Sequence, residues 1–182
     1  VSYHFPAVKG IQAGREYYIS MVPLKLLSRL FPAEEEIVLP EHRAQRRINE
    51  ARIPEIKNYI LDNRDTYVFS ALSASIDGEF KFTPYMDTDA GIFEVDMGSI
   101  FLINDGQHRK AAIEAAMKED PSLEKETISI VFFSDEGLAR SQQMFTDLNK
   151  HAVKTSNSLA TLYDSRDEIA VATKHVIDTI PF

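Results

Sequence analysis

The segment from Ser99 to Met117 constrains this chain most, because an apolar run passes directly into an alanine-rich stretch through Asn-Asp-Gly-Gln-His-Arg. The run Ile100 to Ile103 predicts a short buried strand, and the alanines favour a helix that begins near Gly106. A helix start leaves backbone N–H groups unpaired and carries partial positive charge. The pattern therefore indicates an anion or nucleotide site. Its candidate residues are Asp105, Gly106, Gln107, His108 and Arg109.

The helical spacing places Arg109 at the open end of a buried face. Arg109 shares this stripe with Ala112, Ile113, Ala116 and Met117. A guanidinium on the buried side needs a carboxylate, phosphate or carbonyl partner. Two interpretations stay open: either Arg109 faces a bound anion, or Asp105 caps the helix and Arg109 bridges to an internal carboxylate.

The composition fits one globular domain. The chain has 182 residues, of which 44% are hydrophobic, and is long enough to bury a core. It has no cysteine, which excludes a disulfide framework, a cysteine-based zinc site and a thiol nucleophile, and its histidines lack the spacing of paired metal ligands. No apolar run approaches the roughly 20 residues that span a bilayer, and the chain does not open on a signal-peptide pattern. We therefore expect a cytoplasmic protein without a membrane partner.

The net charge of −8 argues against a surface that is basic all over, so nucleic-acid binding has to come from a local cluster of lysine and arginine. One such cluster lies within residues 39–64, where arginines are interleaved with few acids. These arginines are the candidate DNA-binding residues, namely Arg43, Arg46, Arg47 and Arg52.

Hydrophobic periodicity and breakers predict alternating strands and helices after an irregular lead. The predicted strands are Glu16–Val22, Tyr67–Ile76, Glu79–Thr83, Ile92–Val95, Ile100–Ile103 and Thr127–Phe133. The predicted helices are Leu24–Phe31, Glu41–Ala51, one that Pro54 opens, one that begins near Gly106, one that carries Leu138, Phe145 and Leu148, Thr155–Tyr163 and Asp167–Ile180. Asp77-Gly78 is a hairpin signal. The missing initial methionine and the helical pattern at the end indicate a fragment of a longer chain that lacks a C-terminal part.

Several segments, in their order along the chain, resemble the DndB family of DNA phosphorothioation (DNA sulfur modification) systems. The segments are FPAVKGIQAGREYYISMVPLKLL, RAQR..N.ARIPEI..YI from Arg43 to Ile60, YVFSALSASIDG and INDGQHRKAAIEAA. The resemblance covers nearly the whole chain. The DGQHR motif alone is shared by a wider group of DGQHR-domain proteins, which resembles the ParB/sulfiredoxin-like fold.

This resemblance implies a single α+β domain over residues 1–182, with a small mixed sheet flanked by helices and a helical C-terminal section. In the ParB group, a Gly-Glu-Arg-Arg type motif at a strand-to-helix junction contacts nucleotide phosphates. Gly106 and Arg109 match that motif directly, whereas Gln107 replaces the acid and His108 the first arginine. Losing the acid puts metal-assisted hydrolysis in doubt. Looser matches to other phosphate-binding segments of the group are Gln45, Arg46, Asn149 and Lys150.

The resemblance also implies a function: a DNA-binding transcriptional repressor of a phosphorothioation gene cluster, which binds double-stranded promoter DNA and could respond to a nucleoside triphosphate at the DGQHR junction. Other proteins of the system are candidate partners, and a homodimer is compatible with reading a palindrome. Two alternatives remain open. The junction could belong to a nucleotide-hydrolysing or DNA-processing enzyme, or the chain could be a scaffold with a structural DGQHR corner.

Overall fold

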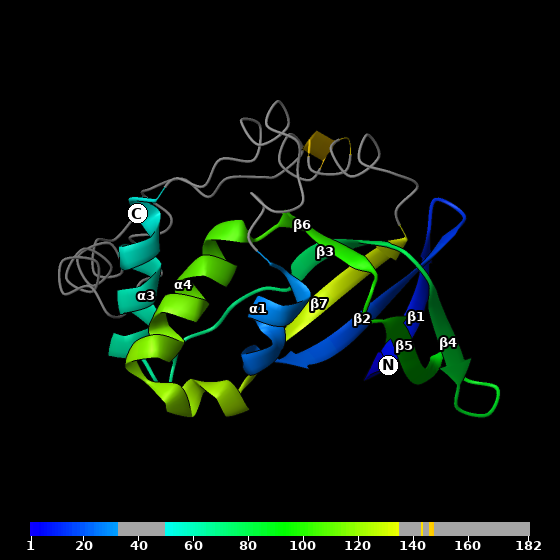
Figure 1. Cartoon of the computed structure of the whole chain (residues 1–182), viewed down its shortest axis with the longest axis horizontal. Coiled ribbons are helices and arrows are strands. Elements are labelled where there is room, and N and C mark those ends of the chain that lie inside the picture. Colours follow the sequence, from blue (N-terminus) through cyan, green and yellow to red (C-terminus); the bar gives the residue numbers. More distant parts are fainter. Residues whose placement is uncertain (33–49, 135–142, 144–145, 148–182) are drawn as a thin grey trace, which may run out of the picture. The chain divides into compact units, whose positions relative to one another are not determined.

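The computed structural model describes residues 1–32, 50–134, 143 and 146–147 (Figure 1). The chain divides into two compact units, Val1–Asn149 and Lys150–Phe182, and the described residues belong to the first. The strands are β1 (Ser2–Gln12), β2 (Arg15–Pro23), β3 (Leu72–Asp77), β4 (Phe80–Pro84), β5 (Ala90–Asp96), β6 (Ile100–Asp105) and β7 (Thr127–Ser134). The helices are α1 (Leu27–Leu30), α3 (Arg52–Asp62) and α4 (Gln107–Glu119), with 3₁₀ turns η1 (Leu24–Leu26) and η4 (Pro121–Lys125).

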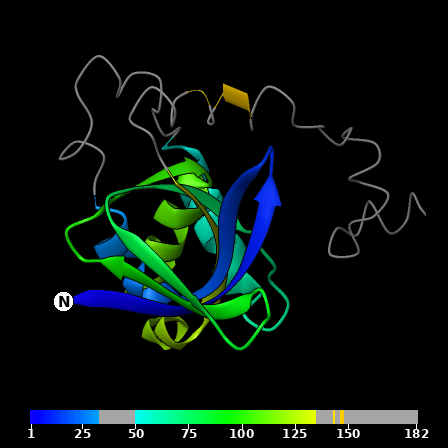
Figure 2. The ribbon, with the colours of Figure 1, turned by 90° about the vertical axis from the view of Figure 1, so that its right-hand side faces the viewer.

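Seven strands form one sheet in the order β4-β5-β1-β2-β7-β3-β6. Neighbours are antiparallel except β3 and β7, which run parallel. Only Gly78 and Glu79 separate β3 from β4, although the two strands are far apart in this order, so the sheet has to curl strongly (Figure 2). The Tyr18 ring of β2 contacts Phe82 of β4 and Phe93 of β5 inside the curl, at centroid distances of 5.3 and 4.8 Å.

The core lies between the concave face of the sheet and the helices. Alternate residues of each strand point to one face, and in β7 the inward residues Ile128, Ile130 and Phe132 are buried. α4 contributes Ile113 and Ala116 to the same core. α3 and α4 pack side by side at one end of the sheet, as Figure 1 shows. This packing holds the β6–α4 junction against the start of α3.

The predicted mixed sheet with flanking helices is confirmed, as are the strands near Glu16–Val22, Ile92–Val95, Ile100–Ile103 and Thr127–Phe133 and the helix after Gly106. The helix expected from Pro54 begins slightly earlier, at Arg52. Of the predicted helical C-terminal section, only residues 143 and 146–147 are described, and these are helical; the rest lies outside the described residues. The predicted Glu41–Ala51 helix also lies outside them, except for its last two residues, which form a turn. No helix within the described ranges is long and apolar enough to cross a bilayer.

Three details of the prediction are wrong. The expected irregular lead is β1, which pairs with both β2 and β5. The Asp77-Gly78 turn does not form a hairpin, because β3 pairs with β6 and β7 while β4 pairs with β5. The strand expected over Tyr67–Ile76 begins only at Leu72, since the residues before it form an irregular segment after α3.

Candidate functional site

The β6–α4 junction turns on Gly106, whose φ of 109° lies in the left-handed region that favours glycine. A Cβ at this position would lie 2.4 Å from the Leu72 side chain and 3.1 Å from Nη2 of Arg109. Backbone conformation and packing therefore both require glycine here. The turn directs α4 away from β6 and leaves the first N–H groups of the helix at the corner.

Arg109 reaches across this corner and binds the chain just before β3. Its Nη1 donates hydrogen bonds to the carbonyl oxygen and Oγ of Ser70, at 2.8 and 2.6 Å, and to the carbonyl oxygen of Ala71 at 3.2 Å. Its Nη2 contacts Oδ2 of Asp105 at 3.3 Å. Burial lowers the pKa of Arg109, and Asp105 partly opposes that effect. Nε and one Nη2 hydrogen make no hydrogen bond to another described residue, so they could bind an added oxygen ligand.

The next two motif residues lie on the first turn of α4. Gln107 donates from Nε2 to the carbonyl oxygen of Ile103 at 3.2 Å, which ties the helix start to β6. The pKa of His108 is lowered, mainly by burial and further by the positive charge of Arg52. Arg52, the exposed first residue of α3, therefore lies close enough to His108 to act on its charge. The corner combines these two side chains with the positive end of a helix.

The structure brings together the predicted residues from Asp105 to Arg109 and adds Arg52 from the predicted DNA-binding set. The remaining candidates lie outside the described residues, namely Arg43, Gln45, Arg46, Arg47, Asn149 and Lys150. In the alternative interpretation Asp105 caps the helix, but the N-cap is Gly106 and the Asp105 side chain contacts Arg109. As its position at the end of a buried face predicted, Arg109 has polar partners within the protein. The binding of an anion at this corner stays a prediction.

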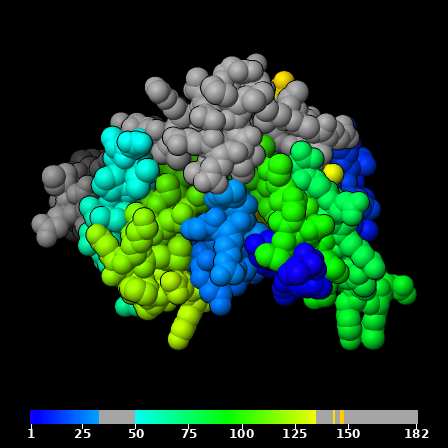
Figure 3. Space-filling model, viewed as in Figure 1, coloured from blue at the N-terminus to red at the C-terminus, as the bar shows by residue number. Residues whose placement is uncertain are grey.

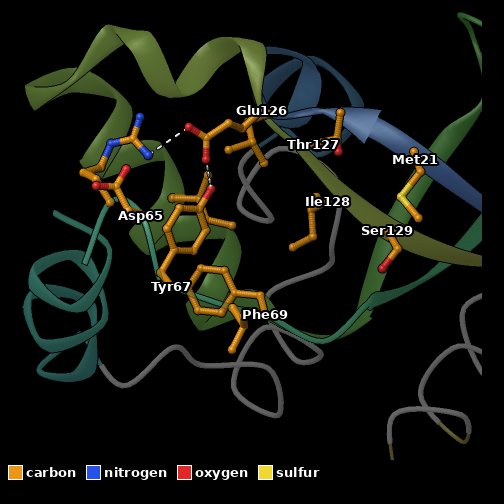
Figure 4. A pocket seen from close by; sticks show the side chains of 12 residues that line it. Met21, Asp65, Tyr67, Phe69, Glu126, Thr127, Ile128 and Ser129 are labelled. Atoms are coloured by element: carbon orange, nitrogen blue, oxygen red, sulfur yellow. Dashed lines mark hydrogen bonds and ion pairs between the residues drawn. The ribbon is translucent and has the colours of Figure 1, made fainter. Parts of the chain in front are cut away.

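A second feature, which sequence reasoning missed, is a pocket of about 480 Å³ between the segment after α3 and the start of β7. Figure 4 shows Tyr67 and Phe69 on one side of it and Ile128 on the other. At its edge, Glu126 accepts a hydrogen bond from the Tyr67 hydroxyl and lies 2.8 Å from Nη1 of Arg64. Burial, followed by the bond to Glu126, raises the pKa of Tyr67 to about 12.

The pocket could not be found from local sequence. Its lining comes from β2, η1, α4, β7 and the segment between α3 and β3, and none of the lining residues belongs to the DGQHR motif. The Arg64 guanidinium that closes one end also donates to Asp120 at 2.7 Å and to Ser122 at 3.0 Å. These contacts join the end of α3 to η4 and depend on tertiary packing alone.

The described part of the chain is thus a mixed α/β domain whose curled sheet leads into a positively charged strand-to-helix corner. The model of one family, DndB, described as DNA-sulfur modification-associated, matches residues 5–182. Because the match spans nearly the whole chain, the chain belongs to the DndB family. No curated protein and no solved structure matches it.

Proposed function

We propose that this protein is a DNA-binding transcriptional regulator that represses a DNA phosphorothioation gene cluster. The observation that carries the proposal is membership of the DndB family, which is associated with DNA sulfur modification. The absence of cysteine supports a regulatory rather than a sulfur-carrying role, because the chain offers no thiol to bear sulfur. The proposed partner is double-stranded promoter DNA in the cytoplasm, bound by a homodimer if the operator is a palindrome.

The corner at the start of α4 provides a physical basis for phosphate binding. Arg52 is exposed and makes no hydrogen bond or ion pair with another residue of the described ranges. His108 lies beside it, and a bound phosphate would favour the protonated form of its imidazole. Backbone N–H groups at the helix start add donors that suit an anion. We propose that these groups contact either DNA phosphate or a regulatory nucleotide at the DGQHR motif.

The structure favours a different contribution from Arg109. Three of its four contacts are to the backbone or hydroxyl of Ser70 and Ala71, so its first role is to fix the corner. In this proposal, Arg109 positions the phosphate-binding groups and offers its remaining N–H donors to the same anion. We also propose that the fold is ParB-like. In that fold the arginine that ends the motif contacts a phosphate, which is the role proposed for the remaining donors of Arg109.

The direct test is promoter recognition by the whole 182-residue chain. Fluorescence anisotropy would compare a duplex that carries the promoter of the modification genes with an unrelated duplex of equal length. We expect the promoter duplex to bind at least tenfold more tightly, which corresponds to about 1.4 kcal/mol. A reporter gene under the same promoter should be repressed when the protein is supplied.

Variants locate the contact. Arg46→Ala and Arg47→Ala, from the predicted basic cluster, should weaken binding to both duplexes, because phosphate contacts are independent of sequence. Arg15→Ala is the control, since Arg15 is exposed at the far end of β2. Equal affinity for both duplexes together with an unrepressed reporter would contradict the proposed function.

A further inference from the structure

The pocket beside β7 has the size and lining of a small-molecule site. Its volume of about 480 Å³ falls within the usual range for such sites, roughly 300 to 1,000 Å³. Aliphatic side chains of Leu24, Ile113 and Ile128 line part of it, and the rings of Tyr67 and Phe69, with centroids 5.7 Å apart, form an aromatic wall. The planes of the two rings are inclined by 54°, so a flat apolar group can stack on one ring and contact the other at an angle.

The aromatic wall is held in place before any ligand arrives. The Tyr59 hydroxyl accepts a hydrogen bond from the backbone N–H of Val68 at 2.8 Å, and the backbone N–H of Tyr67 donates to the Asn63 carbonyl at 2.7 Å. On the other side, Arg109 binds the carbonyls of the two residues that follow Phe69. A wall fixed from both ends loses little conformational freedom when it binds a ligand.

The charge of the lining restricts the ligand further. Asp65 and Glu126 carry negative charge, whereas Arg64 carries the single positive charge of the pocket lining. That guanidinium is already paired with Asp120 and Glu126, at 2.7 and 2.8 Å. An anionic ligand would therefore be repelled, and a cationic one would be attracted both to the carboxylates and to the faces of the rings.

We propose that this pocket binds a planar aromatic small molecule that is uncharged or cationic. The ring of the ligand stacks on Phe69 and contacts Tyr67 at an angle, and its polar edge meets the hydroxyl groups of Thr127 and Ser129. Those two hydroxyls make no hydrogen bond with other residues of the described ranges, so they can orient a ligand. No DNA contact enters this proposal, and its failure would leave the proposed regulatory function standing.

Tryptamine and indole-3-acetate test the proposal, because they share one ring system and carry opposite charges. Binding to the whole chain would be measured by calorimetry and by amide chemical shifts, with attention to Thr127 and Ser129. We expect tryptamine to bind saturably and at least fivefold more tightly than indole-3-acetate, a difference of about 1 kcal/mol. Absence of saturable tryptamine binding up to roughly 5 mM, or a preference for the anion, overturns the proposal.

Three variants complete the experiment. Phe69→Ala should weaken tryptamine binding about fivefold, because one face of the ring contact is lost. Asp65→Lys keeps the fold, since Asp65 is exposed, and should reverse the preference between the two probes. Met86→Ala is the matched control, because Met86 lies on the β4–β5 turn and is 75% exposed. This turn forms the green projection at the lower right of Figure 3. Binding that neither Phe69→Ala nor Asp65→Lys changes would place the probe elsewhere and overturn the proposal.

Discussion

The guanidinium of Arg109 joins segments that are far apart in the sequence. Its Nη1 binds Ser70 and Ala71, and its Nη2 contacts Asp105 at the end of β6. The local pattern predicted that this arginine needs a partner, because helical spacing put it at the end of a buried face. The partners themselves could not be predicted. They are the backbone carbonyls of Ser70 and Ala71, some 40 residues away, and every residue type has such a carbonyl.

Removing this guanidinium is expected to destabilise the domain. Arg109→Ala leaves the carbonyls of Ser70 and Ala71 without their donor and should lower the free energy of unfolding by about 2 kcal/mol. Urea denaturation followed by circular dichroism measures the change. Arg29→Ala, at an exposed position on α1, is the control and should change stability by less than about 0.5 kcal/mol. Equal stability of both variants would show that the Arg109 contacts are not structural.

The left-handed conformation of Gly106 predicts that substituting this residue also destabilises the domain. Gly106→Ala should destabilise the domain by at least about 2 kcal/mol, because a Cβ there costs 1–2 kcal/mol in conformation and also meets the Leu72 side chain. Gly98→Ala is the matched control, since the nearest atom to a Cβ there is 3.5 Å away. A thermal melt that shifts equally for both variants would contradict this assignment.

The lowered pKa of His108 predicts how stability depends on pH. The folded state binds this proton less readily than the unfolded state, whose histidine titrates near 6.5. Above about pH 6.5 the imidazole is neutral in both states; as the pH falls below it, protonation of the unfolded state draws the equilibrium toward unfolding. Wild type should therefore lose stability relative to His108→Gln between pH 6.5 and the folded pKa.

Urea denaturation at several pH values from 7.5 to 5 measures this difference. His4→Gln, on the exposed part of β1, controls for the substitution itself. A difference in stability between wild type and His108→Gln that stays constant across this range would show that the folded protein does not disfavour the charged imidazole.

At the scale of elements, strands were predictable where apolar residues alternate or run together, as in Ile100–Ile103 and Thr127–Phe133. β1 was not predicted as a strand, because its sequence contains Pro6 and Gly10, which are both poor strand formers in isolation. Each of them is paired on one side only, Pro6 with Ile92 of β5 and Gly10 with Tyr17 of β2, so neither lies where β1 has strands on both sides. The Asp77-Gly78 sequence predicted a hairpin that does not form. Its residues suit a hairpin turn, but β4, the strand that follows, pairs at the other edge of the curled sheet and not with β3.

The ring of Phe93 on β5 is expected to stabilise that curl. It lies 4.8 Å from Tyr18, 5.4 Å from Phe80 and 5.6 Å from Phe132, and so joins β2, β4 and β7. Phe93→Ala should lower the free energy of unfolding by about 3–5 kcal/mol. Ile92→Ala, one residue away and 45% exposed, should cost less than about 1 kcal/mol. If chemical denaturation showed that Phe93→Ala lowers the free energy of unfolding as little as Ile92→Ala does, the packing of Phe93 between these strands would be contradicted.

At the scale of the whole molecule, the sequence predicted a mixed sheet with helices, but not the strand order or the pocket beside β7. Strand order depends on pairings between distant segments, and the pocket depends on how five separate segments meet. The corner at the start of α4 was predictable as a cluster of residues because these are contiguous, except for Arg52, which the packing of α3 on α4 adds. Net charge bears on function at this scale too, since a chain at −8 has to bind DNA through a local surface.

The salt dependence of promoter binding tests the central claim most directly. The logarithm of the affinity should fall linearly with the logarithm of salt concentration, because each phosphate contact releases counterions. Arg52→Ala should reduce the slope by about 0.9, the value for one lost contact, while Lys81→Ala on the exposed side of β4 should leave it unchanged. If wild type and Arg52→Ala gave the same slope, the corner at the start of α4 would not contact DNA phosphate.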